Sequence, residues 1–517
     1  MTTWIKFFCV AVAVAISPVT VFAAISIPFT VNLSEAVTVD TAGGTPRIAV
    51  DVGGVTRYAT YTSGTGTSSL IFTYDAAIGD VDLDGVALSS PIDLNGGTIT
   101  DTAGNGATLT FTPPNTTNVR VNYPSLGMDF IADADGRYTL NGAVYNDLPS
   151  FLTATGGTFS RASIGTYYDA AGVLQTAASG VPRFDHDPVT NAAKGILIEE
   201  ARTNEIVNST DLKSPLWLGY CGNWLTTYVP DPAGGNNAVQ IPADSDGCSF
   251  NVSGLYKCTT QFCNGSNFPA GTYTVSVWGR TVSGTLNIGI TTDDTSYSPQ
   301  CTLTTTWKRC FATVTKAATD ALYGPRMFQV VEGAANNQAY ELFGPQVEQG
   351  SFPTSYIPTT TAAVTRAADV LTMPTGSWYN QSAGTGVGTQ SHQSNAGTGF
   401  PMLWRFDDTT NNNRWNAYHR QSDSHVGFDG VTAGFGQGSN NFASTSTATT
   451  SIAGRNALNN MRAAKDGVLG PLDTTWTPPT VTQFVGGLQG QQANKWMQKF
   501  KYYPLALSDT QLQLLTQ

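Results

Sequence analysis

The sequence predicts an all-β protein that is divided into several β-sandwich domains. Charged residues make up only 12% of the 517 residues, whereas roughly a quarter is typical of a soluble domain. Short runs that alternate apolar and polar side chains occur along the whole chain, separated by Gly, Asn and Asp, which is the pattern of strands and turns. The length exceeds what one hydrophobic core usually serves, so we expect several domains.

The overall charge argues against a nucleic-acid partner. The formal net charge is −11 and the sequence pI is near 4.8, and no cluster of Lys and Arg stands out in the sequence. Nucleic-acid affinity depends on clustered cations that neutralise the phosphate backbone. We therefore expect no nucleic acid among the partners.

Residues 1–23 have the layout of a secretory signal peptide. Lys6 precedes an apolar run over residues 7–16, and small residues follow up to Ala23. The run is too short for a comfortable membrane span, although an uncleaved anchor remains an alternative. No later segment is apolar for long enough to cross a bilayer, so the sequence predicts a secreted or cell-surface protein with no transmembrane segment after cleavage.

The cysteines agree with export. Beyond Cys9 in the signal, six remain within one window: Cys221, Cys248, Cys258, Cys263, Cys301 and Cys310. An even, localised set in an exported chain indicates disulfides, with reduced core thiols as the alternative and no C-x-x-C pair to suggest zinc. We favour Cys301 with Cys310 across a strand pair, and Cys258 with Cys263 as a small loop.

Residues 24–112 form the first predicted domain, a small sandwich. Short alternating strands such as "RIAVDVGG" and "SLIFTYD" are separated by turn residues at regular spacing. The pieces "LSEAVTVD", "GTPRIAVDVGG" and "LNGGTITDTAGN" resemble bacterial immunoglobulin-like repeats of surface and adhesin proteins. That resemblance implies a stalk or spacer domain.

A short acidic stretch in this domain suggests calcium. Asp80, Asp82 and Asp84 alternate before Gly85, as the first ligands of a calcium loop do. The acid expected at the twelfth position is replaced by Pro91, for which Asp93 would have to substitute. A solvated acidic turn is the alternative.

Residues 113–204 are predicted to be a connecting segment that begins with a proline hinge, "TPPNTTN" at 112–118. The stretch from "FSRASIGTYYDAAG" to "GVPRFDHDPVTNAAKGILIEEARTN" resembles a segment of phage and prophage tail or virion proteins that joins surface-binding domains. Glu199 and Glu200 are neighbours in a predicted strand, so their side chains leave on opposite faces. They cannot form a catalytic pair together, and we expect one of them to form a structural ion pair with Arg183 or Arg202 instead.

Two further β domains are predicted after this segment. Residues 205–367 resemble carbohydrate-binding modules of the jelly-roll type, on strands such as "TYTVSVWGR" and the ending "FGPQVEQGSFPTSYIPTTTAAVTRAADV". Residues 368–517 resemble concanavalin A-like lectin domains of the laminin-G type. Their last stretch, "LSDTQLQLL", predicts a short helix capped by a serine.

A candidate glycan site lies in the last domain. A sugar offers apolar C–H faces and hydroxyl groups, so its site needs flat aromatic rings beside amides and acids. The stretch "WRFDDTTNNNRWNAYHR" supplies these types. Alternation puts Trp415 and His419 on one face of a strand and Asn416 and Tyr418 on the other, and one face must belong to the core. The candidates are Trp404, Asp407, Trp415, Asn416, Tyr418 and His419.

These observations predict non-catalytic adhesion or receptor binding to a cell-surface glycan. The protein would serve as a phage tail or virion-surface component, or as a prophage-derived adhesin, next to other virion or cell-surface proteins. A polysaccharide depolymerase and a purely structural stalk are the alternatives. No catalytic residue can be nominated, because no nucleophile, metal or phosphate motif accompanies the scattered histidines.

Overall fold

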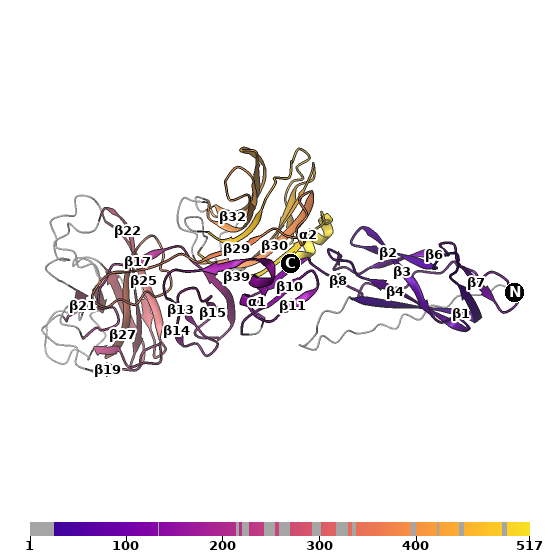
Figure 1. Ribbon diagram of the computed structural model, residues 1–517. Helices are drawn as coiled ribbons and strands as arrows, with labels where there is room; N and C mark the ends of the chain where they lie inside the picture. The colour runs from indigo at the N-terminus through magenta and orange to yellow at the C-terminus, as the bar shows by residue number, and fades with distance from the viewer. Residues whose placement is uncertain are drawn as a thin grey trace.

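The computed structural model describes residues 25–132, 134–213, 217–219, 227–241, 254–257, 269–291, 301–316, 329–332, 338–393, 400–420, 423–443, 449–488 and 494–517. The predicted signal and Cys221, Cys248, Cys258 and Cys263 lie outside these ranges, and so does the predicted pair Cys258–Cys263. Within them, no helix is both long and apolar enough to cross a membrane. The predicted all-β fold of several β-sandwich units is confirmed. Figure 1 shows three units in a row, with the C-terminus in the middle one.

The N-terminal unit is built on a six-stranded antiparallel sheet of order β6-β2-β3-β4-β1-β7, with a small β5–β8 pair beside it. Its core includes Phe29, Val50 and Phe72. Its strands are β1 (Ser26–Asp40), β2 (Arg47–Val52), β3 (Val55–Ser63), β4 (Thr67–Asp75), β5 (Val81–Asp82), β6 (Ala87–Asp93), β7 (Thr98–Asp101) and β8 (Val121–Asn122).

This unit extends past the predicted boundary at residue 112. Thr116 Oγ1 donates a hydrogen bond to the Val86 carbonyl, Val86 N donates to Val119 O at 3.0 Å, and Val121 is buried in the same core. Residues 112–118 are therefore held against the unit. The predicted hinge is wrong, because the prolines lie in a segment whose neighbours still make backbone hydrogen bonds.

The middle unit, here called the sandwich, draws its strands from both sides of residues 205–363. Strand β39 pairs with β30, which follows that segment, and also with β9 and β16, which precede it. The ten-stranded sheet contains β9 (Leu126–Asp129), β10 (Arg137–Leu140), β11 (Ala143–Tyr145), β15 (Phe184–His186), β16 (Ala193–Ile198), β30 (Ala383–His392), β35 (Thr450–Ala457), β36 (Arg462–Lys465), β37 (Val468–Leu469) and β39 (Lys495–Tyr503).

The second sheet of the sandwich has seven strands in the order β12-β29-β38-β31-β32-β33-β34. They are β12 (Thr158–Ser160), β29 (Val370–Pro374), β38 (Gln483–Gly487), β31 (Met402–Asp407), β32 (Arg414–Arg420), β33 (His425–Thr432) and β34 (Phe435–Ala443). The predicted boundaries at 204 and 368 thus need correction. Residues 124–204 belong to the sandwich, because without them one edge of β39 would carry unpaired backbone groups.

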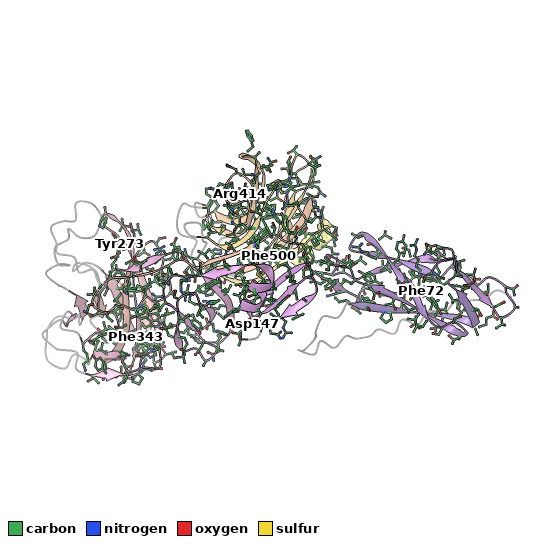
Figure 2. All side chains as sticks on the ribbon, viewed as in Figure 1. Phe72, Asp147, Tyr273, Phe343, Arg414 and Phe500 are labelled. Carbon is green, nitrogen blue, oxygen red and sulfur yellow. A yellow bond between two sulfur atoms is a disulfide. The ribbon has the colours of Figure 1, made fainter. Side chains whose placement is uncertain are left out.

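Aromatic side chains fill the space between the two sheets of the sandwich. The core includes Trp404, Phe406, Trp415, Phe428, Phe484 and Phe500. Phe72, Tyr273 and Phe500, labelled in Figure 2, belong to three separate cores, one in each unit.

Two short helices complete the described part of the sandwich. Helix α1 (Leu148–Thr155) starts at Asp147, whose side chain accepts from Ser150 N, and ends at Gly156 with φ 69°, a left-handed conformation that favours glycine. Helix α2 (Asp509–Leu515) is capped by Ser508, as predicted. Gln511 of α2 hydrogen-bonds to Leu83 N and to Asp84, which fastens the N-terminal unit.

Residues 205–363 form a unit inserted into the sandwich, here called the inserted unit. Two five-stranded sheets, β18-β21-β26-β23-β24 and β19-β20-β27-β22-β25, enclose one core. The strands are β18 (Trp217–Gly219), β19 (Tyr228–Val229), β20 (Ala238–Ile241), β21 (Gly254–Lys257), β22 (Gly271–Thr281), β23 (Leu286–Thr291), β24 (Cys301–Leu303), β25 (Lys308–Lys316), β26 (Gln329–Glu332) and β27 (Tyr340–Gln349).

The chain enters and leaves the inserted unit through one two-stranded ribbon, here called the neck. Strand β17 (Arg202–Asn204) pairs antiparallel with β28 (Val364–Arg366). A hairpin of β13 (Gly165–Tyr168) and β14 (Leu174–Ala177) lies between the sandwich and the inserted unit (Figure 1), and Trp278 Nε1 donates to Tyr168 Oη at 2.7 Å. The two units therefore touch well beyond the neck.

The predicted disulfide between Cys301 and Cys310 is confirmed, with a Cα–Cα distance of 5.9 Å. The sequence suggested that the two cysteines lie on paired strands of one sheet. In the structure they do not. Cys301 lies on β24 and Cys310 on β25, the edge strands of the two different sheets. The disulfide therefore joins the sheets across the core of the inserted unit.

Replacing both cysteines, as Cys301→Ala/Cys310→Ala, is expected to destabilise the inserted unit by about 2–3 kcal/mol. The disulfide closes a short loop and so lowers the conformational entropy of the unfolded chain, and the double variant regains that entropy. Urea unfolding of the full chain measures this difference. Thr302→Ala changes an exposed neighbour on β24 and is expected to have little effect. An unchanged midpoint in the double variant would contradict the structural role of the disulfide.

Candidate functional site

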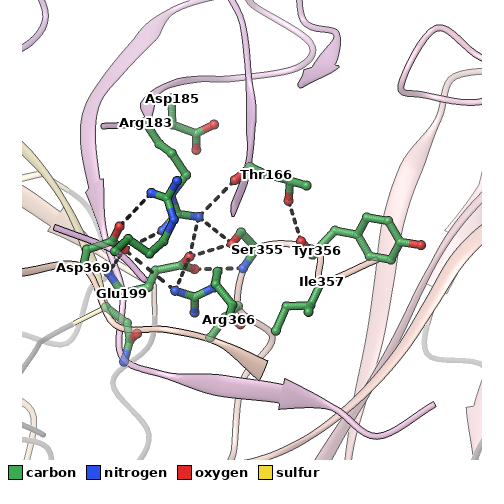
Figure 3. Close-up of polar contacts among 12 residues, drawn as sticks. Thr166, Arg183, Asp185, Glu199, Ser355, Tyr356, Ile357, Arg366 and Asp369 are labelled. Atoms are coloured by element: carbon green, nitrogen blue, oxygen red, sulfur yellow. Dashed lines mark hydrogen bonds and ion pairs between the residues drawn. The ribbon is translucent and has the colours of Figure 1, made fainter. Parts of the chain in front are cut away.

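Five charged side chains are buried where the neck meets the sandwich. Arg183 lies 2.9 Å from Glu199 and 2.6 Å from Asp369, and Arg161 lies 3.1 Å from Asp369. Arg366 of the neck joins them, 3.5 Å from Glu199. All five side chains are fully buried. Figure 3 shows the contacts of Arg183, Glu199, Arg366 and Asp369. This set, the neck cluster, is a scaffold that ties β16, β28 and the segments around them together.

Glu199 is held in its charged form by this cluster. Burial by itself would raise its pKa, but Arg366, Arg183 and hydrogen bonds from Ser355 and Gln393 hold the pKa far below its usual range. Glu200 is half-buried and pairs with Arg202 at 2.5 Å. The sequence predicted that one of the two glutamates pairs with Arg183 or Arg202, and in the structure each glutamate pairs with one of these arginines.

Residues 351–359 cross from the inserted unit towards the neck without joining a sheet, and are here called the strap. Buried side chains form hydrogen bonds with the backbone N–H and C=O groups of the strap. Ser355 N donates to Glu199 Oε1 at 2.8 Å, and Thr354 N donates to Glu348 Oε1 at 2.7 Å. Arg309 Nη1 donates to Thr354 O at 2.5 Å. Because unpaired backbone groups are costly when buried, these side chains fix the path of the strap.

A groove of about 750 Å³ lies between the sandwich and the inserted unit. The β13–β14 hairpin, β16 and β39 form the sandwich wall, and the turn between β24 and β25 forms the opposite wall together with the strap. Aromatic rings from both units line it: Tyr167, Tyr168, Trp278, Trp307, Phe311, Phe352, Tyr356 and Trp496.

The sandwich wall carries one hydrogen-bonded set of side chains. Trp496 Nε1 donates to Asp185 Oδ2 at 2.6 Å, and Tyr168 N donates to the other oxygen at 2.7 Å. The Lys194 ammonium lies 3.2 Å from the centre of the Trp496 ring. Burial raises the pKa of Asp185 and lowers the pKa of Lys194. This wall presents the half-buried Trp496 ring in a fixed orientation.

The opposite wall is more open. Trp307 is half-buried, and Phe311 is 50% exposed. The Arg280 guanidinium lies 4.7 Å from the Trp307 ring, and the Arg309 guanidinium lies 4.5 Å from Trp278. Apolar faces beside hydrogen-bond donors suit a ligand with both apolar and polar faces.

The predicted glycan residues lie elsewhere, and three of them belong to the core. Trp404 and Trp415 are 0% exposed and pack edge to face 5.5 Å apart, and His419 is 1% exposed. They cannot present a surface to a sugar, which corrects the prediction. Alternation places them correctly on one face, but that face meets the ten-stranded sheet.

The other three predicted residues are on the opposite face of the same sheet, and are also buried. Asp407 lies 2.6 Å from Arg405, and Asn416 accepts from Arg414 Nε at 3.1 Å. Tyr418 Oη donates to Asn441 at 2.8 Å. Their polar groups are thus used by neighbouring strands and loops.

The three acids of the predicted calcium loop each have a different main partner, although Asp82 and Asp84 also lie close to each other. Asp80 pairs with Arg57 at 2.6 Å, Asp82 accepts from Gly53 N and Gly85 N, and Asp84 accepts from Gln511. In the part of the chain that the structure describes, no group of three or more His, Cys, Asp or Glu side chains could hold a metal. The structure therefore does not gather these carboxylates into one ligand set, and calcium remains an expectation from the sequence.

A buried basic cluster lies in the sandwich. His392 pairs with Lys495 across β30 and β39, and its ring lies 4.3 Å from that of His419. Lys495 donates to the Met402 and Leu403 carbonyls, and its burial lowers its pKa to about 7. Burial, followed by His392, lowers the pKa of His419 to about 4. We therefore expect this cluster to make the free energy of unfolding depend on pH.

Sequence reasoning missed the groove. Its residues come from stretches that are distant in sequence, at 166–197, 278, 304–311, 351–356, 393 and 496, and no local pattern unites them. One usable signal was "TTWKRC", in which Trp307 is followed directly by two cations.

No protein-family model matches the chain, and no curated protein matches it either. Among solved structures, the CBM40 module of Ruminococcus gnavus IT-sialidase bound to α2,3-sialyllactose has 14% identity and a TM-score of 0.23, covering 27% of this chain and 84% of that chain. Domains LG4-5 of the mouse laminin α1 chain have 10% identity and a TM-score of 0.18, covering 46% and 83%. A tandem of CBM22 modules from Paenibacillus barcinonensis has 9% identity and a TM-score of 0.21, covering 59% and 98%. TM-scores this low carry no inference about this chain's ligand.

Proposed function

We propose that the protein binds a carbohydrate, without cleaving it, in the groove between the sandwich and the inserted unit. One observation carries this proposal: aromatic rings from two units, Trp496 on one side and Trp307 with Phe311 on the other, line the same groove beside cationic side chains. Sugar rings stack their C–H faces on such aromatic surfaces, while donors at the edge bind their hydroxyl groups.

The acid content of the groove favours binding over hydrolysis. Most glycosidases place two carboxyl groups roughly 5 Å or 6.5–9.5 Å apart across the scissile bond. Asp185 is the only carboxylate among the described residues that line the groove, and it already accepts hydrogen bonds from Trp496 and Tyr168. A depolymerase therefore has less support here than an adhesion protein.

The setting that we propose is the outside of a cell or of a phage particle. The predicted signal peptide, the Cys301–Cys310 disulfide and the resemblance of residues 159–204 to phage tail proteins support it. In this setting the N-terminal unit would act as a spacer. A purely structural stalk would not need an aromatic groove, so the groove favours adhesion over that alternative.

Size-exclusion chromatography of a host surface polysaccharide, run with and without the mature protein, tests this function. Earlier co-elution of sugar and protein is expected, and later elution of the sugar would mean cleavage and overturn the non-catalytic proposal. Trp307→Ala and Phe311→Ser are expected to weaken binding about tenfold or more, equivalent to at least ~1.4 kcal/mol. Phe435→Ala is the matched control, because Phe435 is 75% exposed and does not line the groove. Equal loss in all three variants would also contradict the proposed site.

A further inference from the structure

The groove is cationic in a protein that is acidic overall. The chain has a formal net charge of −11, yet Lys194, Lys308 and Arg309 line the groove with Asp185 as the one described acid. Lys194 lies beside Asp185 and Trp496, so its charge is partly compensated. The excess positive charge therefore belongs to Lys308 and Arg309, on the inserted unit.

Arg309 makes no ion pair within the described part of the chain. Its two terminal nitrogens donate to Thr354 O and to Ser276 Oγ, and its buried Nε has no hydrogen-bond partner. The nearby carboxylate of Glu348 accepts from Thr354 N, Thr354 Oγ1 and Gln346 instead. A cation that is held in place by neutral groups retains its charge for a ligand.

Lys308 is exposed next to Arg309 and Trp307. Its ammonium lies 3.5 Å from the Thr302 carbonyl and makes no ion pair with any described residue. Lys308 and Arg309 are successive residues of β25, so their side chains leave the strand on opposite faces. Lys308 is the exposed cation of the two and lines the groove next to Trp307. An exposed ammonium beside a half-buried tryptophan can bind an anionic group on a sugar ring that stacks on the tryptophan.

We infer that the groove selects acidic polysaccharides, and that Lys308 binds the carboxylate of a uronic acid residue while Trp307 stacks on its ring and Arg309 adds a fixed positive charge nearby. This inference rests on the proposed function and narrows its ligand class. A sulfate ester offers the same anionic chemistry, so the test distinguishes the two.

Isothermal titration of the full chain against polygalacturonate, alginate and hyaluronan tests the inference, with each polymer's carboxyl-reduced, neutral derivative as its matched control. We expect at least one acidic polymer to bind about tenfold or more tighter than its neutral derivative, and to bind more weakly as salt rises from about 50 to 300 mM. Chondroitin sulfate, before and after carboxyl reduction, shows whether sulfate alone is enough. Binding of only the sulfated polymers would overturn the carboxylate assignment.

Lys308→Met tests the position of the site. It should weaken binding of the acidic polymer several-fold and leave binding of neutral polysaccharides unchanged. Arg120→Gln removes an exposed cation of the N-terminal unit and should change neither. Equal affinity for acidic and neutral polymers, with both sensitive to Trp307→Ala, would overturn the inference and leave the proposed function standing. Absence of binding to every acidic, neutral and host polysaccharide would overturn both.

Discussion

Glutamine in place of Glu199 is expected to lower the free energy of unfolding by about 3–5 kcal/mol, because it leaves buried arginines without one of their two acids. Glu199 lies 2.9 Å from Arg183 and 3.5 Å from Arg366, and all three side chains are fully buried. Glu199→Gln would leave Asp369 alone against three buried guanidinium groups. The strap should loosen as well, because Glu199 accepts from Ser355 N and Ser355 Oγ.

Glu200→Gln is the matched control, since it makes the same chemical change one residue away. Glu200 pairs with Arg202 in a partly exposed position, where an ion pair contributes about 0–1 kcal/mol. Urea unfolding followed by tryptophan fluorescence compares the two variants, and hydrogen exchange at residues 351–359 reports on the strap. Similar midpoints for the two variants would contradict the role of the neck cluster.

Acid is expected to destabilise the sandwich through His419. Burial and the neighbouring His392 lower the pKa of His419 to about 4, from an ordinary value of 6.5, while Asp423 acts in the opposite direction. Above pH 6.5 the histidine is neutral in both states and costs nothing. As the pH falls from 6.5 to 4, the unfolded chain binds a proton at this histidine and the folded protein does not, so the free energy of unfolding decreases. One pKa unit corresponds to about 1.4 kcal/mol, which gives a loss of about 3 kcal/mol.

The variant His419→Phe isolates this effect. It keeps a ring against His392 but has no group that titrates, so its stability should vary less between pH 6.5 and pH 4 than that of the wild type. Thermal unfolding at steps of half a pH unit gives the stability of both proteins at each pH. Other titrating groups contribute equally to both proteins, so their contributions cancel in the difference between the two stabilities. Parallel curves over this range would show that His419 is not the acid-sensitive group.

Lys495, with a pKa near 7, should affect stability at higher pH. The unfolded chain binds a proton at this lysine below about pH 10.5 and the folded protein binds it only near pH 7, so the free energy of unfolding should decrease as the pH falls from 10.5 to 7.

Several local features followed from the sequence alone. The low content of charged residues and the alternating pattern predicted an all-β fold, and the Ser508 cap predicted helix α2. The neighbouring Glu199 and Glu200 were expected to point in opposite directions, with one of them paired to Arg183 or Arg202, and in the structure each pairs with one of these arginines. The short separation of Cys301 and Cys310 also predicted their disulfide. These features depend on residues that are close together in the sequence, so the local backbone geometry of a few residues is enough to predict them.

Only the tertiary structure decided how these parts combine. Alternation separates Trp415 from Asn416, but it cannot say that the face of Trp415 meets the ten-stranded sheet and becomes core. The pairing of β39 with β9 and β16 makes the sandwich discontinuous, and no local pattern records a pairing between residues some three hundred positions apart. The groove arises in the same way, because its walls come from two units that the neck and the neck cluster hold against each other. Contacts that distant in sequence depend on the free energy of the whole packed structure, and that is why the all-β fold could be predicted from the sequence while the domain boundaries and the candidate site could not.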